Sequence, residues 1–228
     1  MQFEEWQPAY TSILTDFGYD RIADERARDV LVRIVADEDP LTPDEIDLSG
    51  TVAVCGAGPT LTEDLPMARS ADCVVAASTA ADVCLKAGIE PDCMVTDIDK
   101  NPETARTLSK NGTPVAAHAH GDNIELLERY VPTFEISSVL PTTQARPIPP
   151  VVNLGGFTDG DRAAFLADAC GADRLIFPGW SFDDPGVSPE KARKLVWAER
   201  LLLWLERRRN ERFPLLDGRR TEIELPWE

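Results

Sequence analysis

From Thr51 onward, short runs of β-branched and apolar residues alternate with segments of helical pattern, and this alternation constrains the fold more than any other feature. Strands separated by helices form βαβ units, whose crossovers place the strands parallel in one sheet. We expect buried strands at Thr51–Cys55, Cys73–Ala77, Cys93–Thr96, Pro114–Ala117, Thr133–Ser137 and Leu175–Phe177. Helices are expected at Thr79–Ala87, Pro102–Asn111, Ile124–Tyr130 and Asp161–Cys170. The sequence therefore predicts an α/β fold with a mainly parallel, Rossmann-like sheet flanked by helices.

Helical patterns flank this alternating part on both sides. Apolar residues recur at three- and four-residue spacing over the first forty residues, and a proline-rich linker follows at Pro40–Pro43. We expect an N-terminal helical segment over residues 1–45 and an α/β domain over residues 46–228. A long helix should run from about Ser188 to Arg209, because Ser188 and Pro189 are typical of a helix start. The apolar N-terminal helices could pack on the core or on a second subunit, so a homo-oligomer stays open.

The charge of the chain limits its partners. Lys and Arg total 23 against 40 Asp and Glu, which gives a formal net charge of −17. Such a surface repels nucleic-acid backbones and anionic membranes, so we expect neither as a partner. No apolar run approaches the roughly 20 residues of a membrane helix, and no signal peptide is visible, so the cytoplasm is the expected location. Dense carboxylates with only five lysines also suggest a protein kept soluble in high salt, with an ordinary acidic cytosolic protein as the alternative.

In open α/β sheets, ligands bind outside the carboxyl ends of the strands, so the residues that follow each strand are the candidates for chemistry. After the first strand comes a turn that contains Gly56 and Gly58. Glycines let the backbone approach a phosphate closely. This signal is weak, because Leu61 stands where a complete G-x-G-x-x-G would have its third glycine. A structural turn is the alternative, and a dinucleotide cofactor is not expected.

Acidic and imidazole side chains follow two further strands. Asp97 and Asp99 come directly after one strand, and both histidines of the chain, His118 and His120, follow the next together with Asp122. Two carboxylates so placed can converge on Mg²⁺, which prefers oxygen ligands and commonly bridges substrate phosphates. A strand-end turn is the alternative for the aspartate pair. Asn123 could contact phosphate or cap the following helix.

A fourth group precedes the helix expected at Asp161–Cys170. Two glycines lead into Thr158, Asp159, Asp161 and Arg162. One of the two aspartates should cap the helix, which leaves the other free, and Arg162 could neutralise a transferring phosphate. The groups at these strand ends together predict Mg²⁺-dependent phosphoryl transfer, in which positioning and charge neutralisation replace a covalent nucleophile. A Ser-His-Asp hydrolase is disfavoured because no G-x-S-x-G elbow exists.

The arrangement of these motifs resembles the archaeal 6-hydroxymethyl-7,8-dihydropterin diphosphokinase family, the MptE-like proteins, which are related in fold to thiamine pyrophosphokinases. The resemblance runs nearly end to end, and its most specific strings are HAHGDN at 118–123 and GFTDGDR at 156–162. It implies that ATP donates its terminal diphosphate to the hydroxymethyl group of the dihydropterin and leaves as AMP. The product would serve the synthesis of methanopterin-type or folate-type carriers.

The resemblance also implies roles for residues of this chain. Asp97, Asp99 and Asp122 would bind Mg²⁺, and either His118 or His120 would assist deprotonation or bind phosphate. Nucleotide or phosphate contacts are implied at Gly56, Gly58, Asn123, Thr158, Asp159, Asp161 and Arg162. A thiamine-type pyrophosphokinase with the same Mg²⁺·ATP site is the main alternative. A nucleotide-sugar transferase and a nucleotide-binding module without turnover are weaker ones.

Two positions depart from the pattern of this family. Ser78 follows the second strand where relatives often carry an aspartate, and Ser181 stands where relatives often carry another after the last strand. Both departures lie at strand ends near the expected site, so they affect contacts to the pterin or the nucleotide. Asp183 or Asp184 could substitute for the second lost carboxylate.

Overall fold

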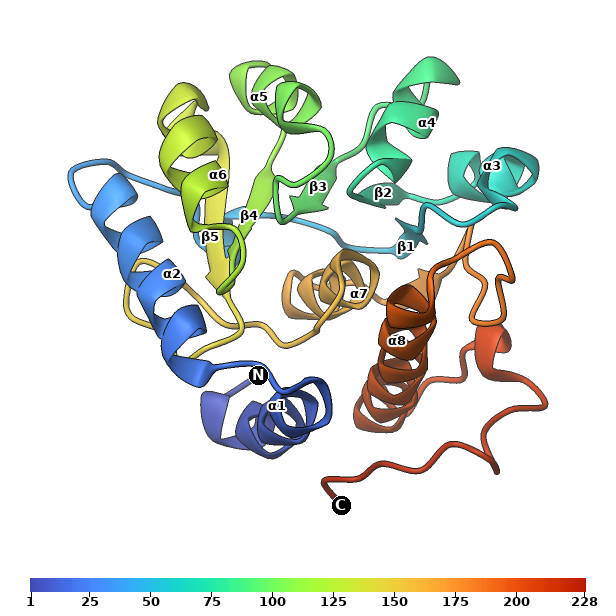
Figure 1. Ribbon diagram of the computed structural model, residues 1–228. Coiled ribbons are helices and arrows are strands. Elements are labelled where there is room, and N and C mark those ends of the chain that lie inside the picture. The colour runs from blue at the N-terminus through green and yellow to red at the C-terminus, as the bar shows by residue number, and fades with distance from the viewer.

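Six parallel strands form one sheet in the computed structural model, which describes residues 1–228 (Figure 1). The order across the sheet is β5-β4-β3-β2-β1-β6, and every neighbouring pair is parallel. The strands are β1 (Thr51–Cys55), β2 (Cys73–Ala77), β3 (Cys93–Thr96), β4 (Val115–Ala119), β5 (Val139–Thr143) and β6 (Arg174–Ile176). The predicted α/β fold with a parallel sheet is therefore confirmed.

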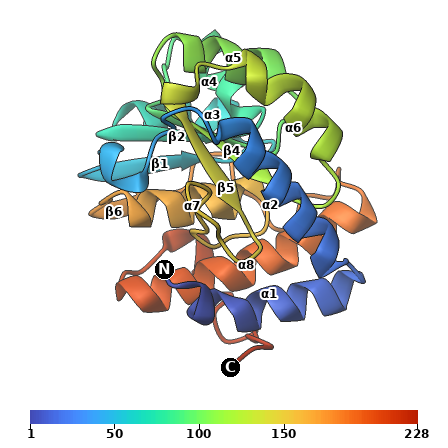
Figure 2. The ribbon, with the colours of Figure 1, turned by 90° about the vertical axis from the view of Figure 1, so that its left-hand side faces the viewer.

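Helices cover both faces of the sheet (Figure 2). Each step from β1 to β5 moves one strand along the sheet, and right-handed crossovers then place all four connecting helices on the same face. These are α3 (Leu61–Arg69), α4 (Ala80–Lys86), α5 (Pro102–Lys110) and α6 (Ile124–Tyr130), and α2 (Arg21–Val35) shares their apolar core. The chain then returns from β5 to β6 beside β1, so α7 (Asp159–Ala169) covers the opposite face with α1 (Phe3–Phe17) and α8 (Pro189–Arg209).

The N-terminal helices pack on the core of their own chain. Trp6 and Tyr10 of α1 are fully buried in the same apolar cluster as Val52 and Val54 of β1. Helix α2 packs against β5, β4 and α6. Of the two expectations for these helices, intramolecular packing is the one observed. The predicted boundary at residue 45 coincides with the short helical turn Pro43–Glu45 that leads into the sheet, and the division into two parts stays a prediction.

The edge strand β5 lies later in the chain than predicted. Residues 133–137, expected to form a strand, lie in and between the 3₁₀ turns Val131–Thr133 and Ile136–Ser138. Pro141 disguises the real strand, because proline removes a ladder hydrogen bond from a central strand. Proline is tolerated in β5 because an edge strand has a neighbouring strand on one side only. The Pro141 carbonyl faces away from β4, where it accepts from the Val152 N–H at 2.9 Å. The other five predicted strands are found within one or two residues, and the long C-terminal helix is confirmed as α8. None of the helices combines the length and the apolar character needed to cross a membrane.

Candidate active site

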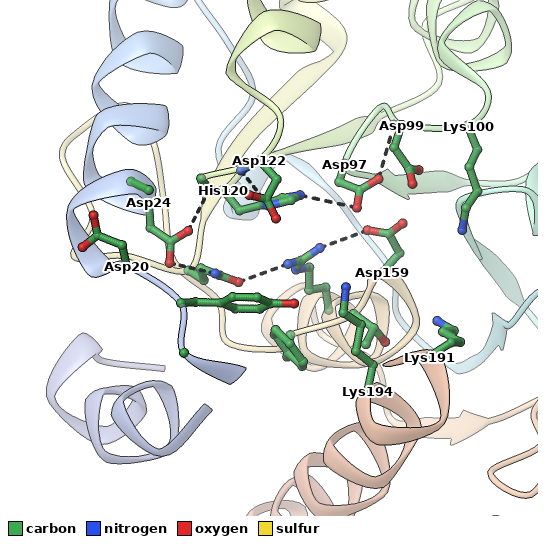
Figure 3. Close-up of a pocket in the computed structure, with 18 residues that line it drawn as sticks. Asp20, Asp24, Asp97, Asp99, Lys100, His120, Asp122, Asp159, Lys191 and Lys194 are labelled. Carbon is green, nitrogen blue, oxygen red and sulfur yellow. Dashed lines mark hydrogen bonds and ion pairs between the residues drawn. The ribbon is translucent and has the colours of Figure 1, made fainter. Parts of the chain in front are cut away.

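Two adjoining cavities lie at the carboxyl ends of the strands. The first, of about 370 Å³, is bounded by the α1–α2 turn, the loops after β3 and β4, and the starts of α7 and α8 (Figure 3). Its charged residues and histidine are Asp20, Asp24, Asp97, Asp99, Lys100, His120, Asp122, Asp159, Arg162, Lys191 and Lys194. The second, of about 310 Å³, is bounded by the loops after β1, β2 and β6. Both are lined by Lys100, Thr158, Asp159 and Lys191, so these four residues form the junction of the two cavities.

The loop after β3 turns two carboxylates toward the first cavity. Between Asp97 and Asp99, the backbone of Ile98 takes a φ of +69°, which is strained for a β-branched residue. The Ile98 side chain is fully buried in the apolar core, and its N–H donates to the Thr96 hydroxyl at 2.9 Å. The Asp99 N–H donates to Asp97 Oδ1 at 3.3 Å. Core packing therefore holds a turn that places both carboxylates on the first cavity.

These carboxylates interact strongly with one another. Burial would raise the pKa of Asp97, but hydrogen bonds to His120 and Asp99 and the charge of Arg162 lower that pKa instead. Burial and the neighbouring Asp97 raise the pKa of Asp99 to about 6. Burial and the charge of Asp97 also raise the pKa of Asp159 to about 7, although Arg162 opposes this. A concentration of negative charge with raised pKa values is what a bound divalent cation would relieve.

The loop after β4 places one histidine on the first cavity. His120 Nε2 lies 3.5 Å from Asp97 Oδ2, and the Asp122 N–H points at His120 Nδ1 at 3.4 Å. With Nδ1 accepting, the ring proton is on Nε2 and faces Asp97, so His120 orients this carboxylate. The Asn123 amide donates to the carbonyls of Asp97 at 2.8 Å and His118 at 2.7 Å. Asn123 thereby joins the ends of β3 and β4, and its side chain makes no helix-capping bond.

The other histidine lies beneath the cavities. His118 is buried, its Nδ1 lies 3.0 Å from the Thr142 hydroxyl, and its Nε2 has no hydrogen-bond partner. It lines neither large cavity, only a void of about 10 Å³ that it shares with Arg162. Burial, followed by the charge of Arg162, lowers the pKa of His118 well below its usual range. Its predicted catalytic role stays a prediction, and the buried ring reaches neither cavity.

The two aspartates in the first turn of α7 have different environments. Asp161 is fully buried and accepts from the Thr158 N–H and hydroxyl and from the Phe157 N–H, so it is the capping aspartate. Asp159 is free of this role and lines both cavities, where Arg162 donates to its Oδ1 at 3.1 Å. A second donor of Arg162 reaches Gln144 Oε1 at 3.2 Å. The alternative left by the sequence is thus resolved, because Asp161 caps the helix and the carboxylate of Asp159 lines the two cavities.

The glycine turn after β1 is engaged in packing. The N–H of Gly56 donates to the Pro178 carbonyl at 3.0 Å, and the N–H of Gly58 donates to the Gly179 carbonyl at 2.8 Å. A Cβ atom at position 58 would lie only 2.5 Å from the Gly179 oxygen. The glycines therefore let the loops after β1 and β6 approach each other. They line the second cavity, but their N–H groups are already donated, which does not favour the predicted phosphate contacts.

The lysines of the site were not identified from the sequence. Lys100, Lys191 and Lys194 line the cavities, and they are three of the five lysines in the chain. A signal existed, because a rare cation in a strongly acidic chain is a candidate for contact with an anionic ligand. Asp24 was also missed. It is buried on α2 and accepts from the Gly121 N–H at 2.8 Å and the Gln144 amide at 2.8 Å, so it fixes the loop after β4 from outside the sheet.

The two departures noted in the sequence lie in the second cavity. Ser78 and Ser181 both line it, at the ends of β2 and β6. Of the two neighbouring carboxylates, Asp184 lines the same cavity, whereas Asp183 forms an ion pair with Arg219. Asp184 is therefore the residue placed to substitute for a lost carboxylate.

The carboxylate donors of the first cavity fit Mg²⁺ as a site that substrate would complete. No group of three or more His, Cys, Asp or Glu side chains lies close enough to hold a metal ion by itself. Mg²⁺, however, usually takes one or two protein carboxylates and completes its octahedron with water and phosphate oxygens. Asp97 and Asp99 supply such a pair. Asp122 is exposed on the wall of the first cavity, and its part in the metal site stays a prediction.

Comparisons with known proteins point to one family of enzymes. Residues 39–186 match the family model described as 6-hydroxymethylpterin diphosphokinase MptE-like. The chain is 38% identical to a 6-hydroxymethyl-7,8-dihydropterin pyrophosphokinase of Methanothermobacter thermautotrophicus, over 91% of this chain and 96% of the relative. Proteins of the same name from Pyrococcus furiosus and Methanocaldococcus jannaschii are 37% and 30% identical, each over 90% of this chain and 95% and 96% of their own lengths.

Proposed function

Because the chain belongs to the MptE-like family of 6-hydroxymethylpterin diphosphokinases, we propose that it transfers diphosphate from ATP to 6-hydroxymethyl-7,8-dihydropterin. The products would be AMP and the pterin diphosphate, and the reaction would depend on Mg²⁺. One observation carries this proposal: the carboxylate pair shares the first cavity with Lys100 and Lys191, and both lysines also line the adjoining second cavity. Transfer between two substrates requires such a junction, with one substrate on each side.

Asp97 and Asp99 are the residues that would hold Mg²⁺. When bound, Mg²⁺ would supply positive charge that neutralises the charge developing on the phosphates during transfer. His120 directs Nε2 at Asp97 and keeps this carboxylate oriented toward the cavity. The strained turn at Ile98 fixes the position of the pair before any ligand binds, which lowers the cost of assembling the site.

The basic residues would bind and orient the polyphosphate. Arg162 is held between Asp159 and Gln144, while Lys194 projects into the first cavity from the first turns of α8 (Figure 3). In the transfer, the hydroxymethyl oxygen forms a bond to the β-phosphorus, the bridge to the α-phosphate breaks, AMP leaves and the hydroxyl proton is released. Fixed cations around the transferring group stabilise this transition state by several kcal/mol in total, about what such electrostatic contacts supply elsewhere.

The test is a direct assay of the purified protein. It is mixed with Mg²⁺, ATP and 6-hydroxymethyl-7,8-dihydropterin at high and at low KCl, with thiamine in a parallel tube, and AMP is followed by mass spectrometry. AMP with the pterin diphosphate supports the proposal. AMP formed only with thiamine transfers the assignment to a thiamine-type pyrophosphokinase. If the folded protein makes no AMP with either acceptor at high and at low KCl, diphosphate transfer to both acceptors is refuted.

A further inference from the structure

We propose that the second cavity holds the ring of the pterin, with Ser78 as a hydrogen-bond partner, and that the first cavity holds the polyphosphate of ATP. This inference rests on the proposed function and assigns one substrate to each cavity. It is carried by the distribution of charge between the cavities and by one buried hydroxyl that has no partner.

The cations of the site are divided unequally. His120, Arg162 and Lys194 line the first cavity alone, whereas Lys100 and Lys191 line both cavities at the junction. No basic side chain belongs to the second cavity alone. ATP carries several negative charges, while 6-hydroxymethyl-7,8-dihydropterin is uncharged near neutral pH. The first cavity also carries six aspartates, so it suits the polyphosphate of ATP together with the Mg²⁺ that Asp97 and Asp99 would hold. The second cavity has two aspartates against its two lysines, and this balance suits the neutral acceptor.

Ser78 supplies an independent observation. Its side chain is only 6% exposed, lines the second cavity, and has a hydroxyl with no hydrogen-bond partner. Its backbone takes a φ of +51°, a region that non-glycine residues seldom adopt, and its N–H is fixed to the Val95 carbonyl at 2.8 Å. Leaving a buried hydroxyl unpaired is unfavourable, so the position is explained by a ligand that completes the bond. The pterin ring carries donors and acceptors along its edges.

The walls of the second cavity suit a flat, largely uncharged ring. Trp180 is fixed by its Nε1, which donates to the Val54 carbonyl at 2.9 Å, and by an edge-on contact with Phe177. A Cβ atom at Gly160 would lie 2.8 Å from the Trp180 ring, so absence of a side chain there keeps the wall in place. Val187 and Leu195 add apolar surface. A ring in this cavity would direct its hydroxymethyl group to the junction, where Lys100, Asp159 and Lys191 meet the phosphates.

Binding measurements on single substrates test this assignment without turnover. Calorimetric titration gives the Kd of 6-hydroxymethyl-7,8-dihydropterin and, separately, of Mg²⁺·ATP for wild type and variants. Ser78→Ala should weaken pterin binding about fivefold and leave ATP binding within about twofold of wild type. Ser181→Phe, which places a bulky ring in the second cavity, should weaken pterin binding by more than about tenfold. Ser70→Ala is the matched control, because Ser70 is exposed at the end of α3 and away from both cavities.

A reciprocal variant covers the first cavity. Lys194→Met should weaken Mg²⁺·ATP binding about tenfold and leave pterin binding unchanged. The assignment is overturned if Ser78→Ala and Ser181→Phe weaken ATP binding and spare the pterin, or if Lys194→Met acts on the pterin alone. If the wild-type protein binds both substrates but makes no pterin diphosphate, the proposed function is wrong, and the assignment of substrates to the two cavities is unaffected.

Discussion

The loop after β1 and the loop after β3 lie at the same edge of the sheet, yet they use their backbones in opposite ways. In the glycine turn after β1, the backbone N–H groups are already used, since Gly56 and Gly58 donate to carbonyls of the loop after β6. The loop after β3 keeps its functional groups available, with the carboxylates of Asp97 and Asp99 on the cavity and the strain confined to buried Ile98. Glycine content alone therefore does not identify a phosphate site. What matters is whether the hydrogen-bonding groups remain free.

The largest effect expected from this comparison is on the loop after β3. Asp97→Asn removes a charge from the first cavity and should lower kcat by at least about a hundredfold, because stabilisation of the transferring phosphates is lost. AMP release at saturating Mg²⁺ measures this effect. Asp37→Asn, at an exposed position on the connection after α2, is the control and should keep full activity. An Asp97→Asn protein with normal kcat would refute a metal-binding role for this loop.

A second prediction concerns the support of the loop after β4. All three groups that contact the Asp24 carboxylate are donors, namely the Gly121 N–H, the Gln144 amide and the Tyr10 hydroxyl. Asp24→Asn turns one acceptor into a donor, so the loop and Arg162 should shift and kcat should fall about tenfold.

Tyr10→Phe is the conservative comparison, because it removes only one of the three donors to Asp24. Its kcat should stay within about threefold of wild type. The informative readout is kcat measured well below the melting temperature, together with the Kd of Mg²⁺·ATP. If Asp24→Asn lowers only the melting temperature and leaves kcat intact, Asp24 supports the fold and does not position the site.

The glycine turn should respond in stability more than in catalysis. In Gly58→Ala, the new Cβ meets the Gly179 carbonyl, so the two loops must separate, at a cost of about 1–3 kcal/mol in the free energy of unfolding. Urea unfolding measures this loss, with the exposed Gly186→Ala as a control. At a temperature where the variant is folded, kcat should stay within about threefold of wild type. Unchanged stability with a tenfold weaker affinity for ATP would show instead that Gly58 contacts phosphate.

The smallest effect expected is a pH dependence of stability due to His118. Burial lowers the pKa of His118 in the folded state below the value of about 6.5 in the unfolded chain. The unfolded state therefore binds one more proton below that pH, so this contribution to stability is complete above about pH 6.5 and is lost as pH falls, by about 1.4 kcal/mol per pH unit. In His118→Gln, urea unfolding between about pH 6.5 and 5 should lose this part of the slope. If the free energy of unfolding falls with pH equally in wild type and variant, His118 does not contribute to the pH dependence of stability.

The motifs at the strand ends could be predicted from the sequence, whereas the residues on packed helices that complete the site could not. Strands β1 to β4 could be predicted because each is a continuous apolar run. The polar groups that follow them meet at one edge of the sheet, as expected. The position of β5 was missed because Pro141 is acceptable only on an edge, and which strand is the edge depends on tertiary order. Asp24 and Lys194 were missed for a related reason. They lie on helices that reach the site only through packing, and helical periodicity says nothing about which polar residue faces a cavity.

The order of the strands has a consequence for how the enzyme is made. β1 to β5 can pair one after another as the chain is synthesised, but β6 must return across the whole sheet so that Arg174 can pair with Thr51. Contacts of such long sequence separation form slowly. Lys191 and Lys194 come later still, on α8, so a nascent chain carries its site carboxylates and Lys100 well before these two lysines. The two cavities at the carboxyl end of the sheet are therefore completed only at the last stage of folding, when β6 and α8 are in place.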